Sequence, residues 1–173
     1  MIILITGASH TGKTLLAQRM LEKTHFPYLS IDHLKMGLIR SGQTAFTPED
    51  DDELTPYLWP IVREMIKTAV ENRQNLIVEG CYVPFDWRND FDETYLREIR
   101  FICLAMTEHY IEDHFEEIVG KESVIESRLI DPCCTVAYLK EENKHYRAGF
   151  QAAGERVCVI DADFEKLIEA LTE

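Results

Sequence analysis

The sequence predicts a doubly wound α/β domain built on a parallel sheet. Short apolar runs alternate with longer segments of helical periodicity along the chain. The apolar runs are continuous and do not alternate with polar residues, which is typical of strands covered on both faces. With 173 residues the chain has the length of one domain and can bury about 70% of its unfolded surface. We therefore expect residues 1–173 to form a single domain.

Five apolar runs are predicted as the strands of this sheet. Each run is short, as expected for a buried parallel strand. The runs are IILIT, FPYLSI, NLIVEG, IRFICLAM and RVCVIDA, at residues 2–6, 26–31, 75–80, 99–106 and 156–162.

Segments of helical periodicity separate the apolar runs. They cover residues 13–22, 32–42, 54–74 and 164–171. Gly42 is placed to end the second helix, because glycine readily adopts the backbone conformation that terminates helices. Pro60 is tolerated in the third helix only near the start of its regular part, since proline lacks the N–H that an inner turn needs.

Two further segments, residues 38–55 and 107–150, are interpreted as insertions over the carboxyl ends of the strands. In doubly wound sheets, ligands bind at that edge. We therefore expect ligand-binding residues at the strand ends and in these two segments.

The chain is acidic, with a net charge of −13 from 31 acidic and 18 basic side chains. Binding of DNA or long RNA depends on positive charge that neutralises phosphates, so we expect no nucleic-acid partner. A small anionic ligand is compatible with this charge, because a few cations in a cleft can oppose the global field. The densest acidic run, EDDDE at 49–53, is interpreted as a solvated loop before the next helix, with metal binding as the alternative.

The sequence indicates neither export nor a membrane span. No apolar run is long enough to cross a bilayer, and no basic leader with a cleavage site precedes the first strand. The five cysteines lack Cys-x-x-Cys spacing, and two lie in predicted strands, which indicates reduced thiols. Cys133 and Cys134 are adjacent and cannot easily face one zinc ion together. These features predict a cytoplasmic protein without a membrane partner and leave its oligomeric state open.

A glycine-rich stretch, GASHTGKT, lies between the first strand and the first helix. It matches the phosphate-loop pattern G-x-x-x-x-G-K-[ST] at every position, in the strand–turn–helix context that the pattern requires. The predicted nucleotide-binding residues are Gly7, Ala8, Ser9, His10, Thr11, Gly12, Lys13 and Thr14.

This stretch supplies several kinds of contact to nucleotide phosphates. Its glycines allow backbone N–H groups to point inward, and the following helix adds the positive end of its dipole. Lys13 is expected to bridge the β- and γ-phosphates of ATP, and the Thr14 hydroxyl is expected to bind Mg²⁺. His10 is interpreted as a tolerated residue at a variable position and not as a base.

A second acid is expected near the third strand, where it would orient the metal. Glu79 is the only acid that follows the apolar residues of NLIVEG. We interpret Glu79 as a residue of the metal site or of the acceptor site. The alternative is a strand-end residue that is hydrogen-bonded to a neighbouring loop.

With these parts assembled, the chain resembles the nucleoside-monophosphate kinase-like group of P-loop kinases, which includes adenylate, shikimate and gluconate kinases. GASHTGKT is the sharp motif, whereas LSIDHLKMGLIRSG, LIVEG and the segment at 107–150 match less closely. The resemblance covers the whole chain in element order. It implies a three-layer P-loop NTPase fold, a five-stranded parallel sheet in the order 2-3-1-4-5, an acceptor-binding region at about 32–55 and a helical lid at about 107–150.

The resemblance also implies a role for Asp32, because several of these kinases place an acid just after the second strand. That acid binds or deprotonates the acceptor hydroxyl, and Asp32 occupies the matching position. A helix N-cap is the alternative role for Asp32, and the two roles are compatible. Either Asp32 or Glu79 could therefore prepare the acceptor.

Arg40 resembles the arginine that monophosphate kinases place on the phosphate of their acceptor, with Lys35 and Arg88 as alternatives. In adenylate kinases a Gly-Phe-Pro-Arg element follows the third strand. This chain has GCYVPFDWR instead, so the arginine is displaced to Arg88 and the loop is aromatic. The difference favours an acceptor that is flatter or less charged than AMP.

The family's lid carries an arginine near ATP, and the position that best matches it holds His114. Cations come later, at Arg128, Lys140, Lys144 and Arg147. We expect Arg128 and Arg147 to stabilise the charge on the transferring phosphoryl group.

The sequence therefore predicts an ATP- and Mg²⁺-dependent kinase of a small molecule, and it favours a hydroxyl compound over AMP as the acceptor. The alternatives are a nucleoside-monophosphate kinase and a nucleotide-binding or nucleotide-hydrolysing P-loop protein without kinase activity. A guanine-reading Asn-Lys-x-Asp is missing, because ENKH at 142–145 lacks the acid. The net charge disfavours a polynucleotide acceptor.

Overall fold

The chain folds around a five-stranded sheet. The computed structural model describes residues 1–120 and 134–172. All strand pairs are parallel, and the order β2-β3-β1-β4-β5 confirms the predicted one. The strands are β1 (Ile2–Gly7), β2 (Tyr28–Ser30), β3 (Leu76–Glu79), β4 (Ile99–Met106) and β5 (Val157–Ile160).

The helices follow the predicted segments, with ends that differ by a few residues. They are α1 (Lys13–Thr24), α2 (Ile31–Arg40), α3 (Asp51–Glu71), α4 (Glu93–Leu96), α5 (Glu108–Gly120), α6 (Val136–Ala152) and α7 (Phe164–Thr172). A 3-10 helix, η1 (Trp87–Asp90), and the short helix α4 were not predicted, because four residues are too few to show a helical period.

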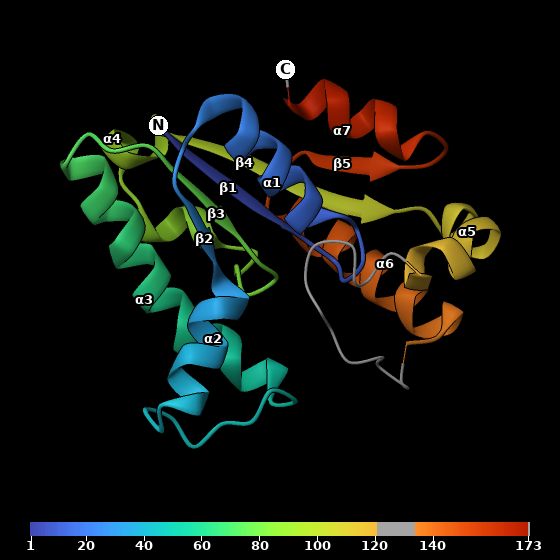
Figure 1. The fold of residues 1–173 in the computed structure, drawn as a ribbon, viewed down its shortest axis with the longest axis horizontal. Coiled ribbons are helices and arrows are strands. Elements are labelled where there is room, and N and C mark those ends of the chain that lie inside the picture. Colours follow the sequence, from blue (N-terminus) through green and yellow to red (C-terminus); the bar gives the residue numbers. More distant parts are fainter. Residues whose placement is uncertain (121–133, 173) are drawn as a thin grey trace.

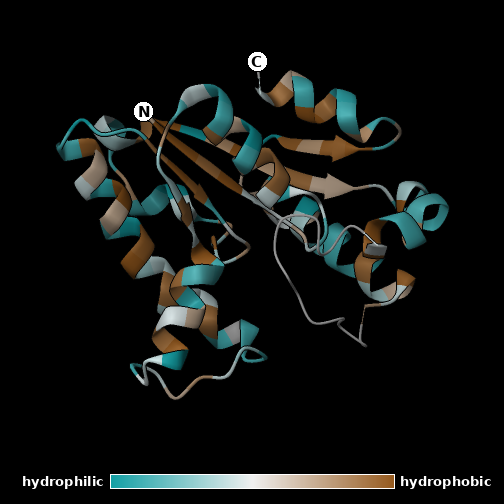
Figure 2. Ribbon diagram, in the orientation of Figure 1, coloured by the Kyte–Doolittle hydropathy of each residue, from teal (hydrophilic) through white to brown (hydrophobic). Residues whose placement is uncertain are grey.

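Helices cover both faces of the sheet (Figure 1). Helices α1 and α7 pack on one face, where Ile3 and Ile5 of β1 point, and α3 and α6 pack on the other, where Ile2 and Leu4 point. All four side chains are buried, which explains why the strand sequence is continuously apolar. Figure 2 shows the strands as hydrophobic ribbons between helices of mixed character.

Ser30 caps helix α2, with its side-chain oxygen accepting a hydrogen bond from the His33 backbone N–H at 3.4 Å. The alternative role of Asp32 as N-cap is therefore wrong, because Asp32 lies inside the first turn. A carboxylate there still interacts favourably with the helix dipole. Gly42 follows the helix end with a φ of 71°, in the left-handed conformation that glycine adopts easily.

Helix α3 begins well before Pro60, so the expectation that Pro60 lies near the start of the regular part is wrong. Pro56 and Pro60 both lie inside the helix, one turn apart. Both are exposed, so water can solvate the carbonyl groups that lose their intrahelical partners. The buried face of the helix, with Leu58 and Val62, keeps its packing against the core.

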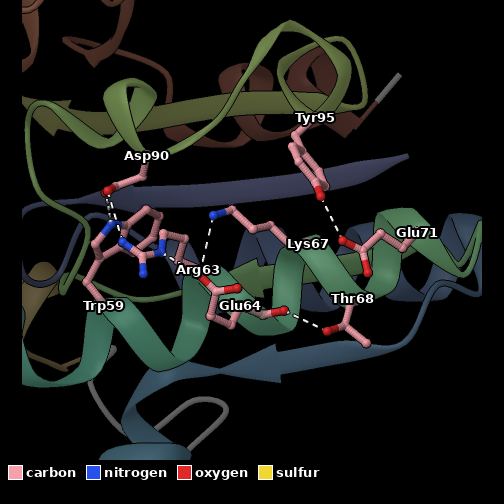
Figure 3. Close-up of polar contacts among 8 residues, drawn as sticks. All are labelled: Trp59, Arg63, Glu64, Lys67, Thr68, Glu71, Asp90 and Tyr95. Carbon is pink, nitrogen blue, oxygen red and sulfur yellow. Dashed lines mark hydrogen bonds and ion pairs between the residues drawn. The ribbon is translucent and has the colours of Figure 1, made fainter.

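Polar contacts join α3 to the segment that follows β3 (Figure 3). The Asp90 carboxylate accepts hydrogen bonds from Trp59 Nε1 at 2.7 Å and from Arg63 Nη1 at 3.0 Å. At the other end of the helix, the Tyr95 hydroxyl donates to Glu71 at 2.7 Å. These contacts hold the loop after β3 against α3, and this loop forms one wall of the candidate site described below.

In the described part of the chain, no helix is both long and apolar enough to cross a membrane. Among the described residues, Cys81, Cys103 and Cys158 form no disulfide bond.

Candidate active site

The glycine-rich stretch forms a loop between β1 and α1, as its sequence predicts. Gly7 has a φ of 141°, and a Cβ there would lie 2.1 Å from the Leu104 carbonyl oxygen. Gly12, at the start of α1, has a φ of 79°, and a Cβ there would lie 2.5 Å from the Phe164 ring. Both positions therefore require glycine. His10 also has a positive φ, of 61°, which is an uncommon conformation for a residue with a Cβ.

Lys13 folds back over this loop. Its Nζ donates to the Ala8 carbonyl oxygen at 2.7 Å, and the Thr11 hydroxyl donates to the same oxygen at 2.8 Å. Lys13 is 9% exposed, so most of its aliphatic stem is buried while its ammonium stays inside the loop. This position places a cation beside the backbone N–H groups at the start of α1, where an anion is favoured.

Thr14 and Glu79, the two predicted metal-binding residues, lie together. The Thr14 hydroxyl donates to Glu79 Oε1 at 3.4 Å, and the Tyr28 hydroxyl donates to Glu79 Oε2 at 2.9 Å. Glu79 is 1% exposed and ends β3, beside Ile5 of β1 in the sheet register. A hydroxyl and a carboxylate are oxygen ligands of the kind that Mg²⁺ prefers, so these residues fit the predicted metal.

A cavity of about 1120 Å³ opens beside the loop and reaches from it to α2, α3 and the segment after β3. Of the predicted residues, the cavity lining includes Ser9, His10, Gly12, Lys13, Thr14, Asp32 and Glu79. It does not include Gly7, Ala8, Thr11, Arg40, Arg88 or Arg147. Five of the eight predicted phosphate-loop residues therefore share one cavity with Asp32.

The end of the cavity at α2 contains a chain of polar contacts. Lys35 Nζ lies 3.3 Å from Asp32 Oδ1 and donates to the Tyr82 hydroxyl at 2.6 Å. The Tyr82 hydroxyl in turn donates to Asp51 Oδ1 at 2.7 Å. Burial raises the pKa of Tyr82, so this hydroxyl keeps its proton and its role as a donor. Tyr82 and Asp51 were missed as site residues; Asp51 belongs to the acidic run that was interpreted as a solvated loop.

Cys81 lies between the two ends of the cavity. The charges of Asp32 and Asp51 at one end and of Lys13 in the loop all act on its thiol, but burial is the main influence and raises its pKa to about 12. Cys81 therefore stays a neutral thiol at physiological pH and is not a nucleophile.

Helix α6 contacts both the phosphate loop and Cys81, in the segment after β3. Glu142 Oε1 accepts from the Ser9 backbone N–H at 3.1 Å and from the Ser9 hydroxyl at 2.8 Å. The other oxygen of Glu142, Oε2, is buried and has no hydrogen-bond partner among residues 1–120 and 134–172. One turn further along the helix, the Tyr146 hydroxyl donates to the Cys81 carbonyl oxygen at 3.0 Å. Neither contact was predicted, because the partners are far apart in the sequence.

Solved structures of kinases resemble this fold. A gluconokinase from Sinorhizobium meliloti 1021 matches with a TM-score of 0.57 at 15% identity, over 98% of this chain and 88% of that one. A shikimate kinase from Bacteroides thetaiotaomicron matches with a TM-score of 0.57 at 17% identity, over 98% and 95% of the two chains. A deoxyadenosine kinase from M. mycoides matches with a TM-score of 0.54 at 16% identity, over 99% and 96%. The chain has the P-loop kinase fold.

This result confirms the resemblance in fold that the phosphate loop and the element order predicted. Neither a protein-family model nor a curated protein matches the sequence.

Within this P-loop kinase fold, Arg88 lies outside the cavity lining and binds Glu155. Arg88 Nη2 donates to Glu155 Oε2 at 3.1 Å, and Arg88 Nε donates to Oε1. The guanidinium carbon also lies 4.8 Å from the centre of the Trp87 ring. These contacts give Arg88 a structural partner instead of the acceptor contact that the family pattern implied.

Arg40 and Arg147 are exposed and also lie outside the cavity lining. Arg40 ends α2, and Arg147 lies in α6. Arg128 lies outside the described residues. The structure therefore does not gather Arg40, Arg88 or Arg147 at the cavity.

Helices α5 and α6 occupy most of the predicted lid of the P-loop kinase fold. His114, which takes the place of the family's arginine, interrupts α5 with a φ of −120° and stacks on Tyr110 at 4.5 Å between ring centres. Lys140 of α6 pairs with Glu112 of α5. This pair joins the two helices, so Lys140, one of the candidate lid cations, is bound to Glu112.

Proposed function

We propose that the chain is a kinase that transfers the γ-phosphoryl group of Mg-ATP to a hydroxyl group of a small molecule. The observation that carries this proposal is the single cavity that joins Lys13 and Thr14 of the phosphate loop to Asp32 of α2. The proposal is also supported by the fold, which the chain shares with known kinases.

Lys13 and the phosphate loop are proposed to hold the donor. Lys13 would exchange the Ala8 carbonyl oxygen for oxygens of the β- and γ-phosphates, because an ammonium favours an anionic partner over a neutral one. Thr14 and Glu79 would hold Mg²⁺, Thr14 through its hydroxyl and Glu79 directly or through water. When bound there, Mg²⁺ neutralises charge on the phosphate oxygens.

Asp32 is proposed to orient and deprotonate the acceptor hydroxyl. The acceptor oxygen forms a bond to the γ-phosphorus while the bond from that phosphorus to the β–γ bridging oxygen breaks. The hydroxyl proton passes to the Asp32 carboxylate, and ADP leaves. Lys35, 3.3 Å from Asp32, holds the carboxylate in place. We assign the base to Asp32 and not to Glu79, because Glu79 already contacts Thr14 and Tyr28.

We also infer that residues 1–173 act as one domain, that the segment at 107–150 serves as a lid over the donor, and that the protein works in the cytoplasm. Helix α6 supports the lid assignment, because Glu142 reaches the phosphate loop at Ser9. A lid limits wasteful hydrolysis of ATP by excluding water from the reacting groups.

A coupled assay of ATP consumption with a panel of small hydroxyl compounds tests the proposed function. Lys13→Ala is expected to reduce turnover by a factor of about 100 or more, whereas Lys23→Ala, an exposed lysine of the same helix, leaves it unchanged. Asp32→Asn is expected to keep ATP binding and lose turnover on the acceptor, with Asp161→Asn as the exposed control. Full turnover in the Asp32 variant would remove Asp32 from the role of base.

A further inference from the structure

The charges at the acceptor end of the cavity indicate which class of hydroxyl compound it binds. Resting on the proposed function, we propose that the acceptor is an amine-bearing polyol, such as an amino sugar or an aminoglycoside, whose ammonium group binds among Asp32, Asp51 and Asp86. This class bears positive charge, whereas gluconate and shikimate, after which two of the kinases of similar fold are named, bear a carboxylate.

Carboxylates outnumber cations at this end of the cavity. Asp32 of α2 and Asp51 of α3 are joined there through Lys35 and Tyr82, and Asp86, in the segment after β3, lines the same cavity; Lys35 is the one lysine of the described lining besides Lys13 of the phosphate loop. Three different segments thus contribute carboxylates to one cavity. A cationic ligand gains from this arrangement, and an anionic ligand is repelled by it.

Lys35 offers little charge to an anionic acceptor. Its Nζ lies 3.3 Å from Asp32 Oδ1, donates to the Tyr82 hydroxyl at 2.6 Å and sits 5.0 Å from the centre of the Tyr82 ring. The Lys35 side chain is 12% exposed. An acceptor carboxylate or phosphate would have to compete with Asp32 for this ammonium.

Arginine, the usual partner of carboxylates and phosphates, is placed elsewhere. Among the residues that the structure describes, Arg19 is the one arginine in the cavity lining, and it donates to Glu165 at 2.6 Å, on the donor side between α1 and α7. Arg88 is engaged by Glu155 outside the cavity. The described part of the acceptor end therefore lacks the two-pronged arginine contact that anionic acceptors favour.

Aromatic rings in the cavity provide surfaces on which a sugar-like cation can stack. Phe85 and Tyr146 line the cavity, with ring centres 6.1 Å apart at nearly a right angle. Phe85 is held in place by Phe150, at 4.9 Å, and by His145, at 5.1 Å. Aromatic faces stack on the C–H face of a sugar ring and attract ammonium groups.

Three compounds with one carbon skeleton test the charge preference: glucosamine, N-acetylglucosamine and gluconate, with kanamycin as a larger amine. We expect kcat/KM for the better of the two amines to exceed that for N-acetylglucosamine and for gluconate by a factor of about 10 to 100. The KM of that amine should rise with ionic strength, because salt screens the attraction. Equal activity on the neutral compound, or a preference for gluconate, would overturn the proposal.

Asp51→Asn tests the contribution of one carboxylate while keeping the shape of the side chain. We expect it to raise the KM of the amine about tenfold and the KM of neutral acceptors by a smaller factor. Asp161→Asn, an exposed aspartate outside the cavity, is the matched control. A thermal melt of each variant confirms that it is folded. An equal KM change for charged and neutral acceptors would contradict a role in charge recognition.

Ligand-observed NMR on the same compounds, with a non-hydrolysable ATP analogue present, separates the two proposals. Binding of the analogue and of gluconate or a nucleoside monophosphate, but not of the amines, overturns the acceptor class and leaves the kinase proposal standing. Binding of the analogue with none of the compounds bound also overturns the acceptor class. Loss of analogue binding itself would overturn the proposed function.

Discussion

Replacement of Arg88 by alanine would leave the Glu155 carboxylate without its partner. The Glu155 side chain is 5% exposed, whereas the Arg88 side chain is 48% exposed. The two residues are therefore not equivalent. Removal of the arginine leaves a buried carboxylate without its partner. Removal of the carboxylate leaves a guanidinium that water can still solvate. We expect Arg88→Ala to destabilise the fold more than Glu155→Gln does.

The size of the effect follows from this asymmetry. Breaking a fully buried ion pair by removing one partner costs about 3–5 kcal/mol. Because half of Arg88 contacts solvent, which screens the pair, we reduce the expected cost of Arg88→Ala to about 2 kcal/mol. Glu155→Gln should cost about 1 kcal/mol or less. The double variant should be more stable than Arg88→Ala alone, since no buried charge is left without a partner.

Urea denaturation measures these differences, with the midpoint compared at a constant slope. For a chain of this length, about 2 kcal/mol corresponds to a fall in Tm of roughly 4–8 °C. The acceptor KM of Arg88→Ala should equal that of the parent protein. A variant that keeps its stability within about 0.5 kcal/mol and raises the acceptor KM would refute the structural role and make Arg88 an acceptor contact. A larger cost for Glu155→Gln than for Arg88→Ala would refute the reasoning from exposure.

Three further substitutions or treatments test other parts of the structure. Glu142→Gln keeps a hydrogen-bond acceptor for the phosphate loop but removes a negative charge. In a calorimetric titration, ATP affinity should therefore rise roughly fivefold more than ADP affinity. An unchanged ratio of ATP affinity to ADP affinity would place Glu142 away from the γ-phosphate. Gly80→Ala puts a Cβ 2.7 Å from the Ile31 Cβ and should lower the free energy of unfolding, measured in urea, by about 1–3 kcal/mol. Gly37 has open space around it, so Gly37→Ala should raise the free energy of unfolding by up to about 1 kcal/mol. Equal effects of the two substitutions would contradict the packing at Gly80. The raised pKa of Cys81, about 12, keeps it protonated at pH 8, so native-state alkylation should be about a thousandfold slower than for an ordinary thiol; fast labelling traced by mass spectrometry would contradict this.

The features that could be predicted from the sequence are those that depend on residues close together in the chain. The strands appear as continuous apolar runs because helices cover both faces of the sheet, as Ile2 and Ile3 illustrate by pointing to opposite faces. The phosphate loop is a local motif whose glycines are required by their own backbone angles. Glu79 could be placed beside Thr14 because a parallel sheet brings its carboxyl ends together.

The rest depends on pairs of residues that the sequence does not relate. Arg88 looks like a displaced acceptor arginine until Glu155, 67 residues away, is seen to bind it. Glu142 gives no local signal, because its partner Ser9 is 133 residues away. Asp51 lies in a run of acids that is typical of a solvated loop, and only the position of Tyr82 makes it part of the site.

Helix α6 accepts two hydrogen bonds from Ser9 of the phosphate loop through Glu142 and donates one to the Cys81 carbonyl oxygen through Tyr146, so one element contacts both the phosphate loop and the segment after β3. A shift of this helix on binding at one end must alter the free energy of binding at the other. By thermodynamic linkage, the factor by which a nucleotide changes acceptor affinity equals the factor by which the acceptor changes nucleotide affinity. Replacing Tyr146 by phenylalanine, which removes the hydrogen bond to Cys81, should bring both factors toward one by the same amount.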